Sequence, residues 1–412
     1  MIVKDYIKVF EKHGFGMFVH FGVYSALGEG EWARHNGIYS NEEYDRIYKN
    51  FKPETDWAEK LVDTACAAGC KYITLTTRHH DGFSLYDTLG LNDYDAPHIL
   101  GGRDLVREFV DACRARDIVP FFYHTLLDWI VPSYKENFKE YLAYLRKSVE
   151  ILCTKYGKIG GLWFDGMWDK PEEDWEEDAL YGLIRSYQPD AMIINNTGLS
   201  HLGELGHIEL DSVTFERGNP KPINLETSPK YVASEMCQVF ADHWGYAKHD
   251  FNFKSLATII SDYCSCRRFG ANFLMNVGPM GNGYIRPLDD AMLRTLGEWV
   301  AINEEALYIP RPSGIELEGN SKNFILQNGN SYYVFFHELG MGGSANVVAG
   351  TPAAENSTVR FNFDKKIKSV RWLDEDTKIQ PQLKQDGNKV EIFANRQRYG
   401  VSMAVRVAKF EV

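Results

Sequence analysis

Short apolar runs alternate with longer helical patterns through most of this chain, and this alternation restricts the possible folds more than any other feature. It extends from about Gly14 to Leu307 and is typical of repeated β-α units whose strands form a parallel sheet. The expected strands are Phe15–Phe21, Tyr72–Thr77, Ile118–His124, Ile159–Phe164, Ala191–Asn195, Ile208–Phe215, a weaker Val232–Phe240, and Asn272–Val277. Eight such strands predict an α/β fold with a closed (β/α)8 barrel of the TIM type over residues 1–309.

Two of the connecting segments repeat apolar side chains every three or four residues, which predicts amphipathic helices. The two stripes are Phe138, Leu142, Leu145, Val149 and Leu152, and Leu288, Met292, Leu296 and Trp299. We interpret both stripes as faces that pack against the core.

The pattern changes after Pro310-Arg311-Pro312, where two prolines interrupt the helical spacing. Strand-like segments follow at Tyr332–Phe336, Val359–Phe363 and Val390–Phe393, the last preceded by a turn at Asp386-Gly387-Asn388. Residues 310–412 are therefore expected to form a separate, antiparallel β-sandwich domain.

The charge balance restricts the partners of this chain. With 412 residues and a formal net charge of −12, the chain lacks the concentrated Lys and Arg that nucleic acid or an anionic membrane requires. The first residues show neither the basic start nor the apolar core of a secretory signal, and no stretch reaches ~18 uninterrupted apolar residues. We expect a cytoplasmic protein with a neutral small-molecule ligand, and leave a homo-oligomer open.

Cysteine usage agrees with that expectation. The chain has seven cysteines, an odd number, and they fall within apparent helices or strands. They are Cys66, Cys70, Cys113, Cys153, Cys237, Cys264 and Cys266. This pattern favours reduced, buried thiols over a disulfide framework.

Asp165 follows the apolar run Ile159–Phe164 directly and is flanked by aromatic residues. It would lie at the C-terminal tip of a barrel strand, the end at which barrel enzymes carry out their reactions. A carboxylate there is a candidate nucleophile or base. The alternative is structural, because Asp before Gly often caps a helix or starts a turn.

Other polar and aromatic residues follow the remaining strands, so a barrel would gather them at one mouth. They are His20, Glu31, Trp32, His79, His80, Asp81, Tyr123, His124, Trp163, Asn195, Asn196 and Glu216. Carboxylates, imidazoles, amides and aromatic rings together suit a sugar, whose hydroxyls need donors and acceptors and whose apolar face packs on rings. Each member also has a purely structural interpretation, as a satisfied side chain, a core aromatic residue or a solvated charge.

Adjacent histidines raise the question of a metal. His79 and His80 should point to opposite sides of a strand, and the chain has no His-x-His or His-Glu-x-x-His spacing. We therefore expect neither a metal ion nor another cofactor.

The order of several motifs resembles the glycoside hydrolase family 29 α-L-fucosidases over roughly residues 10–307. The blocks that carry the resemblance are Phe15–Ser25, Glu31-Trp32, Lys71–Phe83 with its His-His-Asp-Gly-Phe, Leu162–Gly166, Trp244-Gly245-Tyr246, and Asn276–Pro279 with Gly281 and Gly283. His-His-Asp-Gly-Phe and Trp-Phe-Asp-Gly are specific when they occur in this order.

The resemblance implies a retaining exo-α-L-fucosidase that acts on fucosylated oligosaccharides or glycoconjugates. In that role Asp165 attacks the anomeric carbon, and the residues that hold the fucose are His20, Glu31, Trp32, His79, His80, Tyr123 and Trp163. Glu216, in a Thr-x-Glu context, is our choice for the acid/base, and Glu235 is its rival.

The chain also departs from the family pattern. Many members carry an Arg near the end of the fifth strand, where this chain has Asn195-Asn196-Thr197-Gly198, and Ser234 replaces a common Trp. Two alternatives follow: a glycosidase for a related sugar such as an α-L-galactoside, and a catalytically silent, fucose-binding protein of the lectin kind.

Overall fold

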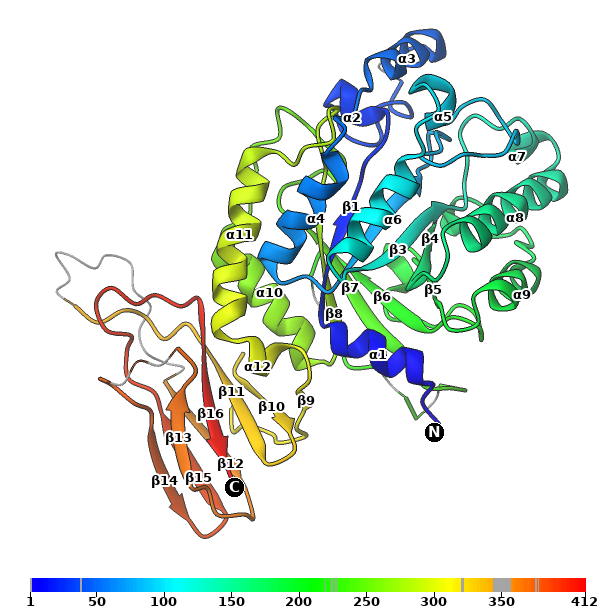
Figure 1. The fold of residues 1–412 in the computed structure, drawn as a ribbon. Helices are drawn as coiled ribbons and strands as arrows, with labels where there is room; N and C mark the ends of the chain where they lie inside the picture. Colours follow the sequence, from blue (N-terminus) through cyan, green and yellow to red (C-terminus); the bar gives the residue numbers. More distant parts are fainter. Residues whose placement is uncertain are drawn as a thin grey trace. The chain divides into compact units, whose positions relative to one another are not determined.

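The computed structural model describes residues 2–37, 39–218, 220–223, 225–226, 228–319, 322–343, 357–374, 376 and 378–412. The chain divides into two compact units (Figure 1). The first comprises Met1–Lys254 and Asn272–Arg294, and the second comprises Ser255–Ala271 and Thr295–Val412.

The first unit contains the expected closed barrel of eight parallel strands, hydrogen-bonded in chain order from β1 to β8. The strands are β1 (Phe15–Val19), β2 (Tyr72–Arg78), β3 (Val119–Thr125), β4 (Gly161–Asp165), β5 (Met192–Asn195), β6 (Ser212–Glu216), β7 (Ala233–Val239) and β8 (Asn272–Val277). The prediction of the barrel is confirmed, but β6 begins four residues after the predicted Ile208. The Ile208 side chain is 48% exposed, and burial begins only with Leu210 and Asp211, just before the strand.

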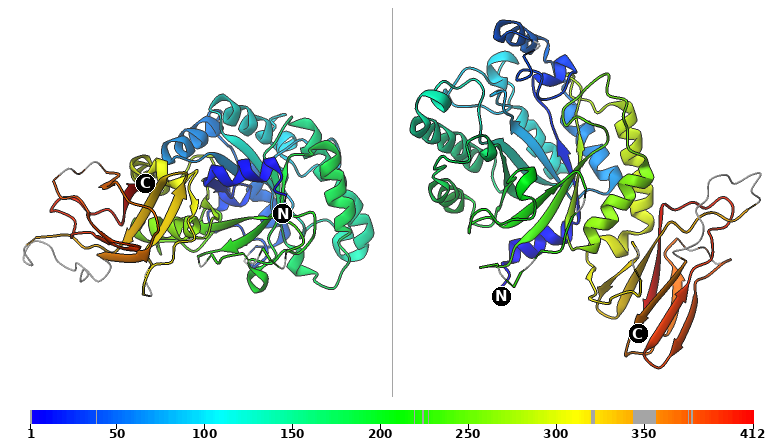
Figure 2. Two further views of the ribbon diagram at one scale, coloured as in Figure 1. Left: turned by 90° about the horizontal axis from the view of Figure 1, so that it is seen from below. Right: turned by 180° about the vertical axis from the view of Figure 1, so that it is seen from behind.

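Large side chains fill the barrel interior, which makes it a packed core with no central channel. Phe18, Tyr72, Tyr123, Trp163 and Leu274 belong to one buried cluster from five strands. At the N-terminal ends of the strands, Phe10 of α1 (Asp5–His13) joins the same cluster. Figure 2 shows α1 in deep blue across this end of the barrel, so the open end is the opposite one.

Helices of the first unit lie outside the strands (Figure 1). They are α4 (Trp57–Ala68), α6 (Leu105–Ala115), α8 (Phe138–Lys155) and α9 (Glu177–Tyr187), with the shorter α2 (Tyr24–Leu27), α3 (Asn41–Ile47), α5 (Ala96–Ile99) and α7 (Ser133–Glu136). The described residues between β5 and β7 contain no α-helix. The β-α repeat is therefore irregular on this side.

The first predicted apolar stripe is confirmed, because Leu142, Leu145, Val149 and Leu152 of α8 are buried. The second is confirmed only in its C-terminal half along α11 (Pro287–Ile302): Leu296 and Trp299 are buried, whereas Leu288 is 45% exposed. Spacings of four residues drift around a helix with 3.6 residues per turn, so Leu288 lies roughly 80° away from Leu296.

The second unit contains the expected antiparallel β-sandwich. One sheet has the order β13-β16-β11-β10-β9 and the other β12-β15-β14. Their strands are β9 (Arg311–Pro312), β10 (Phe324–Asn328), β11 (Ser331–His337), β12 (Thr358–Asn362), β13 (Ser369–Trp372), β14 (Gln382–Asp386), β15 (Lys389–Phe393) and β16 (Val405–Glu411). The helix α10 (Leu256–Arg268) is part of this unit and contacts β9, β10 and β16; α12 (Glu304–Leu307) belongs to it as well.

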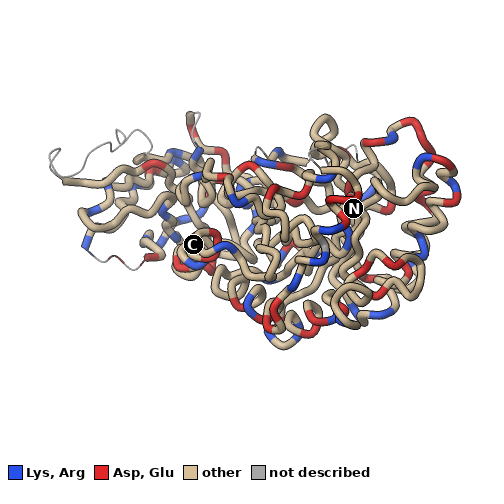
Figure 3. The backbone as a smooth tube through the Cα atoms, turned by 90° about the horizontal axis from the view of Figure 1, so that it is seen from above, with Lys and Arg blue, Asp and Glu red and all other residues tan. Residues whose placement is uncertain are grey.

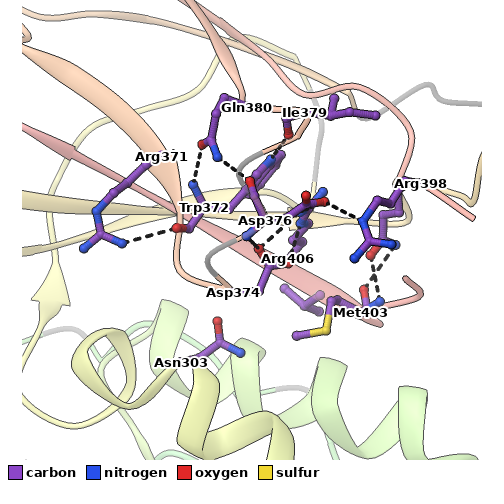
Figure 4. Close-up of polar contacts among 12 residues, drawn as sticks. Asn303, Arg371, Trp372, Asp374, Asp376, Ile379, Gln380, Arg398, Met403 and Arg406 are labelled. Atoms are coloured by element: carbon purple, nitrogen blue, oxygen red, sulfur yellow. Dashed lines mark hydrogen bonds and ion pairs between the residues drawn. The ribbon is translucent and has the colours of Figure 1, made fainter. Parts of the chain in front are cut away.

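A buried arginine lies beside the sandwich core. Arg406 is 2% exposed, and its guanidinium is 4.0 Å from the ring centroid of Trp372. Its Nε and Nη2 donate to Asp374 at 2.8 and 3.1 Å, and Nη2 also donates to Asp376 at 3.2 Å (Figure 4). Two carboxylates therefore compensate the buried charge.

The surface shows acidic and basic residues interspersed along both units in the view of Figure 3. All seven cysteines are free thiols, and six are buried as expected, whereas Cys66 is exposed. Among the described residues, no helix combines the length and the hydropathy needed to cross a membrane.

Candidate active site

A pocket of about 510 Å³ is lined by residues at the C-terminal ends of the barrel strands and the loops that follow them. Its lining residues are Phe18, His20, Trp32, His79, His80, Tyr123, Trp163, Asp165, Trp168, Asn196, Gly198, Leu199, Ser200, Glu216, Cys237 and Trp244. Most of the site residues expected from the sequence are in this list. The expected residues that do not line the pocket are Glu31, Asp81, His124, Asn195 and Glu235.

Asp165 is the last residue of β4 and accepts hydrogen bonds on both carboxylate oxygens. Oδ1 accepts from Trp168 Nε1 at 3.1 Å and from the Asn196 amide at 3.4 Å, and Oδ2 accepts from Tyr123 Oη at 3.2 Å. His80 Nε2 lies 3.4 Å from Oδ2. Burial raises the pKa of Asp165, but the hydrogen bonds and the charge of His80, together with Trp168 and Tyr123, hold it below its usual value. Asp165 is thus kept ionised.

The two adjacent histidines lie in the same pocket, contrary to the expectation that they point to opposite sides. The register between β2 and β3 shifts between Thr76 and Arg78, and His79 and His80 follow the end of β2, where the alternation of a regular strand no longer applies. Their ring centroids are 4.2 Å apart.

The proton position on His80 follows from its partner. His80 Nδ1 is 2.6 Å from Thr125 Oγ1, and that hydroxyl donates its own proton to the Leu127 carbonyl at 2.6 Å. Thr125 therefore accepts from His80, which places a proton on Nδ1. His80 Nε2 is then the ring nitrogen that faces Asp165 Oδ2.

His20 and His79 are buried and neutral. Burial lowers the pKa of His20 to about 3, against a smaller opposing effect of its hydrogen bond with Asn276, and burial lowers the pKa of His79 as well. Asn276 Nδ2 donates to the Trp244 carbonyl at 2.8 Å, so its Oδ1, 2.6 Å from His20 Nδ1, accepts the imidazole proton. His20 Nε2 is then an acceptor suited to a ligand hydroxyl.

Glu216 is the last residue of β6 and lines the pocket beside Asp165. Its Oε2 accepts from Asn196 Nδ2 at 3.1 Å, and its Oε1 lies 3.7 Å from Arg217 Nε. Burial raises the pKa of Glu216, and the negative charge of Asp165 adds to this effect. The pKa values of the two pocket carboxylates are therefore shifted in opposite directions, that of Asp165 downward and that of Glu216 upward.

One amide nitrogen contacts both carboxylates. Asn196 Nδ2 is 3.4 Å from Asp165 Oδ1 and 3.1 Å from Glu216 Oε2, and Thr214 Oγ1 donates to Asn196 Oδ1 at 3.1 Å. The nearest oxygens of the two carboxylates cannot be farther apart than the sum of the first two distances. That upper limit is compatible with the ~5–5.5 Å separation between the two carboxyl groups of retaining glycosidases.

Glu235, the rival acid/base residue, is buried on β7 outside the pocket lining. Its Oε1 accepts from Trp163 Nε1 at 2.9 Å, and its Oε2 accepts from the Tyr72 hydroxyl. Burial raises its pKa to about 7, against the hydrogen bonds from Tyr72 and Trp163. The pKa alone would suit a catalytic acid, but both oxygens hold core side chains in place.

Glu31 is 5% exposed and accepts a hydrogen bond from the Gly245 amide at 2.7 Å. The neighbouring Trp244 lines the pocket. The carboxylate of Glu31 therefore holds the backbone next to Trp244, an aromatic residue of the pocket lining.

Aromatic rings cover the pocket interior. Trp163 stacks on Tyr123 with ring centroids 5.7 Å apart and meets Phe18 edge-on at 5.1 Å. Asn196 was expected at this mouth of the barrel, Trp244 belonged to a motif without an assigned role, and Trp168 had not been singled out. Cys237 and residues 198–200 had no sequence signal, because their position depends on how β5, β6 and β7 and their loops meet.

Within the described part of the chain, no group of three or more His, Cys, Asp or Glu side chains is arranged to hold a metal ion. The carboxylates and imidazoles of the pocket can supply acid, base and nucleophilic groups. Two carboxyl groups whose pKa values are shifted in opposite directions suit a nucleophile and a general acid. With the sugar-compatible lining, the fold and the site define a glycoside hydrolase.

The chain belongs to the alpha-L-fucosidase family, since the family profile of that description matches residues 3–305. Tissue alpha-L-fucosidase of Bos taurus is 28% identical over 361 residues, which cover 80% of this chain and 74% of that protein. Alpha-L-fucosidase isoenzyme 1 from Paenibacillus thiaminolyticus has a similar structure, with a TM-score of 0.81, 26% identity and 98% of each chain covered.

A further solved structure is a GH29 alpha-L-fucosidase from Bacteroides thetaiotaomicron, trapped as a covalent intermediate with 2-fluoro-fucosyl fluoride. It has a TM-score of 0.80 and 20% identity, and covers 100% of this chain and 96% of that one. At this identity the likeness concerns the fold.

Proposed function

We propose that this protein is a retaining exo-α-L-fucosidase that removes terminal α-L-fucosyl residues from oligosaccharides or glycoconjugates in two displacement steps. The observation that carries the proposal is the shared contact of Asn196 with Asp165 and Glu216, because it keeps the nearest oxygens of the two carboxylates close enough for the short separation of a retaining site.

In the first step a carboxylate oxygen of Asp165 attacks the anomeric carbon while Glu216 gives its proton to the glycosidic oxygen. The bond from the anomeric carbon to that oxygen breaks, and a fucosyl ester of Asp165 forms. The lowered pKa of Asp165 and the raised pKa of Glu216 supply the two protonation states this step requires.

In the second step Glu216, now ionised, takes a proton from water, and the water oxygen attacks the anomeric carbon. The ester bond breaks and Asp165 returns to its carboxylate form. Esterification removes the negative charge of Asp165, which had raised the pKa of Glu216. The first step therefore makes Glu216 more acidic and prepares it to act as a base.

The remaining pocket residues suit a 6-deoxy sugar. His20 Nε2 is an acceptor for one hydroxyl, and the neutral ring of His79 offers a second polar edge. Phe18, Trp163 and Trp244 form an apolar surface, on which a methyl group at C5 would pack. The relatives and solved structures named above are all fucosidases, which supports the same sugar.

The test is release of nitrophenol from a nitrophenyl α-L-fucoside by the wild type and by Asp165→Gly, with and without azide. We expect the wild type to be active, the variant to lose at least ~10³-fold, and azide to restore turnover with β-fucosyl azide as product. The matched control is Asp93→Gly, because Asp93 is an exposed loop carboxylate, and it should keep wild-type activity.

Full activity of Asp165→Gly would disprove the mechanism. Turnover of an α-L-galactoside in clear preference to the fucoside would transfer the same mechanism to a different sugar. Fucose binding without turnover of any activated glycoside would instead indicate a lectin-like protein.

A further inference from the structure

The position of Glu216 determines where the leaving group of the proposed fucosidase must lie. A general acid has to be within hydrogen-bond reach of the glycosidic oxygen that it protonates. The group beyond that oxygen therefore lies on the Glu216 side of Asp165, toward the ends of β5 and β6. This inference rests on the proposed function and concerns what the enzyme accepts as leaving group.

Two apolar side chains of the pocket are unusually exposed, and both lie in loops near that side. Trp168, in the loop after β4, is 37% exposed, and Leu199, in the loop after β5, is 70% exposed. By contrast, His20, His79, Tyr123 and Trp163, assigned to the fucose, are at most 5% exposed. The pocket thus has a buried inner part and a solvent-exposed apolar rim.

The rim is held in a defined position. Trp168 Nε1 donates to Asp165 Oδ1 at 3.1 Å, and its ring stacks on Trp32 with centroids 6.1 Å apart and planes at 19°. Gly198 has φ +87°, and a Cβ there would be 3.3 Å from Trp168 Cδ1, so the loop backbone lies directly against the indole. The exposed indole surface, Leu199 and the hydroxyl residue Ser200 then face the same pocket.

We propose that Trp168, Leu199 and Ser200 form a leaving-group subsite that binds the pyranose ring to which the fucose is attached. An exposed ring and an aliphatic side chain suit the apolar face of a sugar, and a hydroxyl suits its polar edge. The substrates are accordingly fucosylated oligosaccharides in which a sugar, not a small alcohol, departs.

The test compares two substrates that differ only in the leaving group. α-L-Fucosyl fluoride fills the inner pocket and releases fluoride, whereas a fucosyl-galactose disaccharide must also occupy the rim. The measured quantity is the ratio of the kcat/KM values for the two substrates. The kcat/KM value for the disaccharide is divided by the kcat/KM value for the fluoride. This division removes the effects of a substitution on fucose binding and on Asp165.

Leu199→Ala should lower this ratio about fivefold, because it removes exposed aliphatic surface that the leaving sugar would cover. The matched control is Leu89→Ala, at a leucine that is 54% exposed and outside the pocket lining. The control should leave the ratio at its wild-type value.

Two variants of Trp168 separate the effect of its hydrogen bond to Asp165 from the effect of its ring. Trp168→Phe keeps a ring but loses the hydrogen bond to Asp165, so kcat/KM should fall for both substrates with little change in the ratio. Trp168→Ala loses the ring as well, and the ratio should fall by a further ~10-fold.

An unchanged ratio in both Leu199→Ala and Trp168→Ala would overturn the subsite, and so would an equal fall of the ratio in Leu89→Ala. Failure of the wild type to release fluoride from the fucosyl fluoride would instead refute the proposed function, and the subsite with it. The two failures are therefore distinguishable.

Discussion

At the scale of single residues, the site depends on the different surroundings of two similar carboxylates. Asp165 accepts three hydrogen bonds and lies beside His80, whereas Glu216 has the Asn196 amide and a longer contact to Arg217. Burial raises the pKa of both groups, and only Asp165 receives enough compensation to reverse the effect. Hydrogen bonding, more than burial, distinguishes the proposed nucleophile from the proposed acid.

This difference predicts the pH dependence of kcat/KM. The first step needs Asp165 ionised and Glu216 protonated, so the rate falls as pH decreases through the lowered pKa of Asp165 and as pH increases through the raised pKa of Glu216. In Glu216→Ala the alkaline fall should disappear. With a nitrophenyl fucoside, kcat should drop by ~10²-fold or more, because the second step has no base.

Glu235→Gln is the matched control for that experiment. Glu235 lies outside the pocket lining, with its oxygens bound to Trp163 and Tyr72, so the alkaline limb should remain. If the limb disappeared in Glu235→Gln and persisted in Glu216→Ala, the acid/base assignment would have to be exchanged. Steady-state rates between pH 4 and 9 are sufficient to decide.

Sequence reasoning reached the pocket residues that follow directly from strand ends, such as His20, Asp165 and Glu216. It could not separate Glu31 and Glu235 from them, because residue type and proximity to a strand end are the same for residues that face the pocket and for those that support it. It also placed His79 and His80 on opposite sides, since an irregular register at the end of a strand leaves no mark in the spacing of residues.

At the scale of elements, Gly161 of β4 lies where any side chain would collide with both neighbouring strands. A Cβ on Gly161 would be 2.6 Å from the Met192 carbonyl of β5 and 2.6 Å from Phe121 Cε1 of β3. Glycine in a strand interior often marks such a close backbone approach. The strand can present Asp165 at its C-terminal end only while Gly161 leaves this space free.

Gly161→Ala should therefore destabilise the protein by ~1–3 kcal/mol and lower kcat, because the added methyl group moves β4 against rigid neighbours. Gly182→Ala is a control of the opposite sign. Gly182 lies within α9 with nothing within 4 Å of its Cβ position, so alanine should stabilise the helix by ~0.5–1 kcal/mol. Thermal unfolding followed by circular dichroism measures both changes, and equal effects would contradict the packing argument.

The existence and order of the barrel strands could be predicted from the sequence, because buried parallel strands are continuous apolar runs. The boundaries of the elements and the rotational phase of the helices could not be predicted in this way. Ile208 was included in β6 because an isolated apolar residue looks the same whether it is buried or exposed. Leu288 was included in the buried stripe of α11 for the same reason.

At the scale of the whole molecule, the division into two units does not follow the change in sequence pattern near Pro310. The helix α10 continues the barrel's β-α alternation in sequence but contacts β9, β10 and β16 of the second unit. The apolar spacing of a helix specifies that one face is buried and does not specify which sheet buries it. The boundary at residue 309 remains a prediction from sequence.

The second unit should depend on its buried charge cluster. Arg406→Ala leaves Asp374 and Asp376 without their shared partner and removes the cation from Trp372, so the unit should lose ~3–5 kcal/mol. Arg398→Ala is the control, because this half-exposed arginine pairs with Asp376 at the surface and should contribute less than ~1 kcal/mol. Calorimetry should show an earlier transition for Arg406→Ala alone; identical traces for the two variants would contradict this account.

The hydrogen bond between Trp168 and Asp165 gives the protein a built-in optical reporter. Indole emission responds to nearby charge, and Trp168 Nε1 is 3.1 Å from the oxygen whose negative charge disappears when the sugar ester forms. Occupancy of the covalent intermediate should therefore be visible as a change in tryptophan fluorescence during a single turnover. The rates of the two chemical steps could then be followed separately in the unlabelled protein, with natural, colourless substrates.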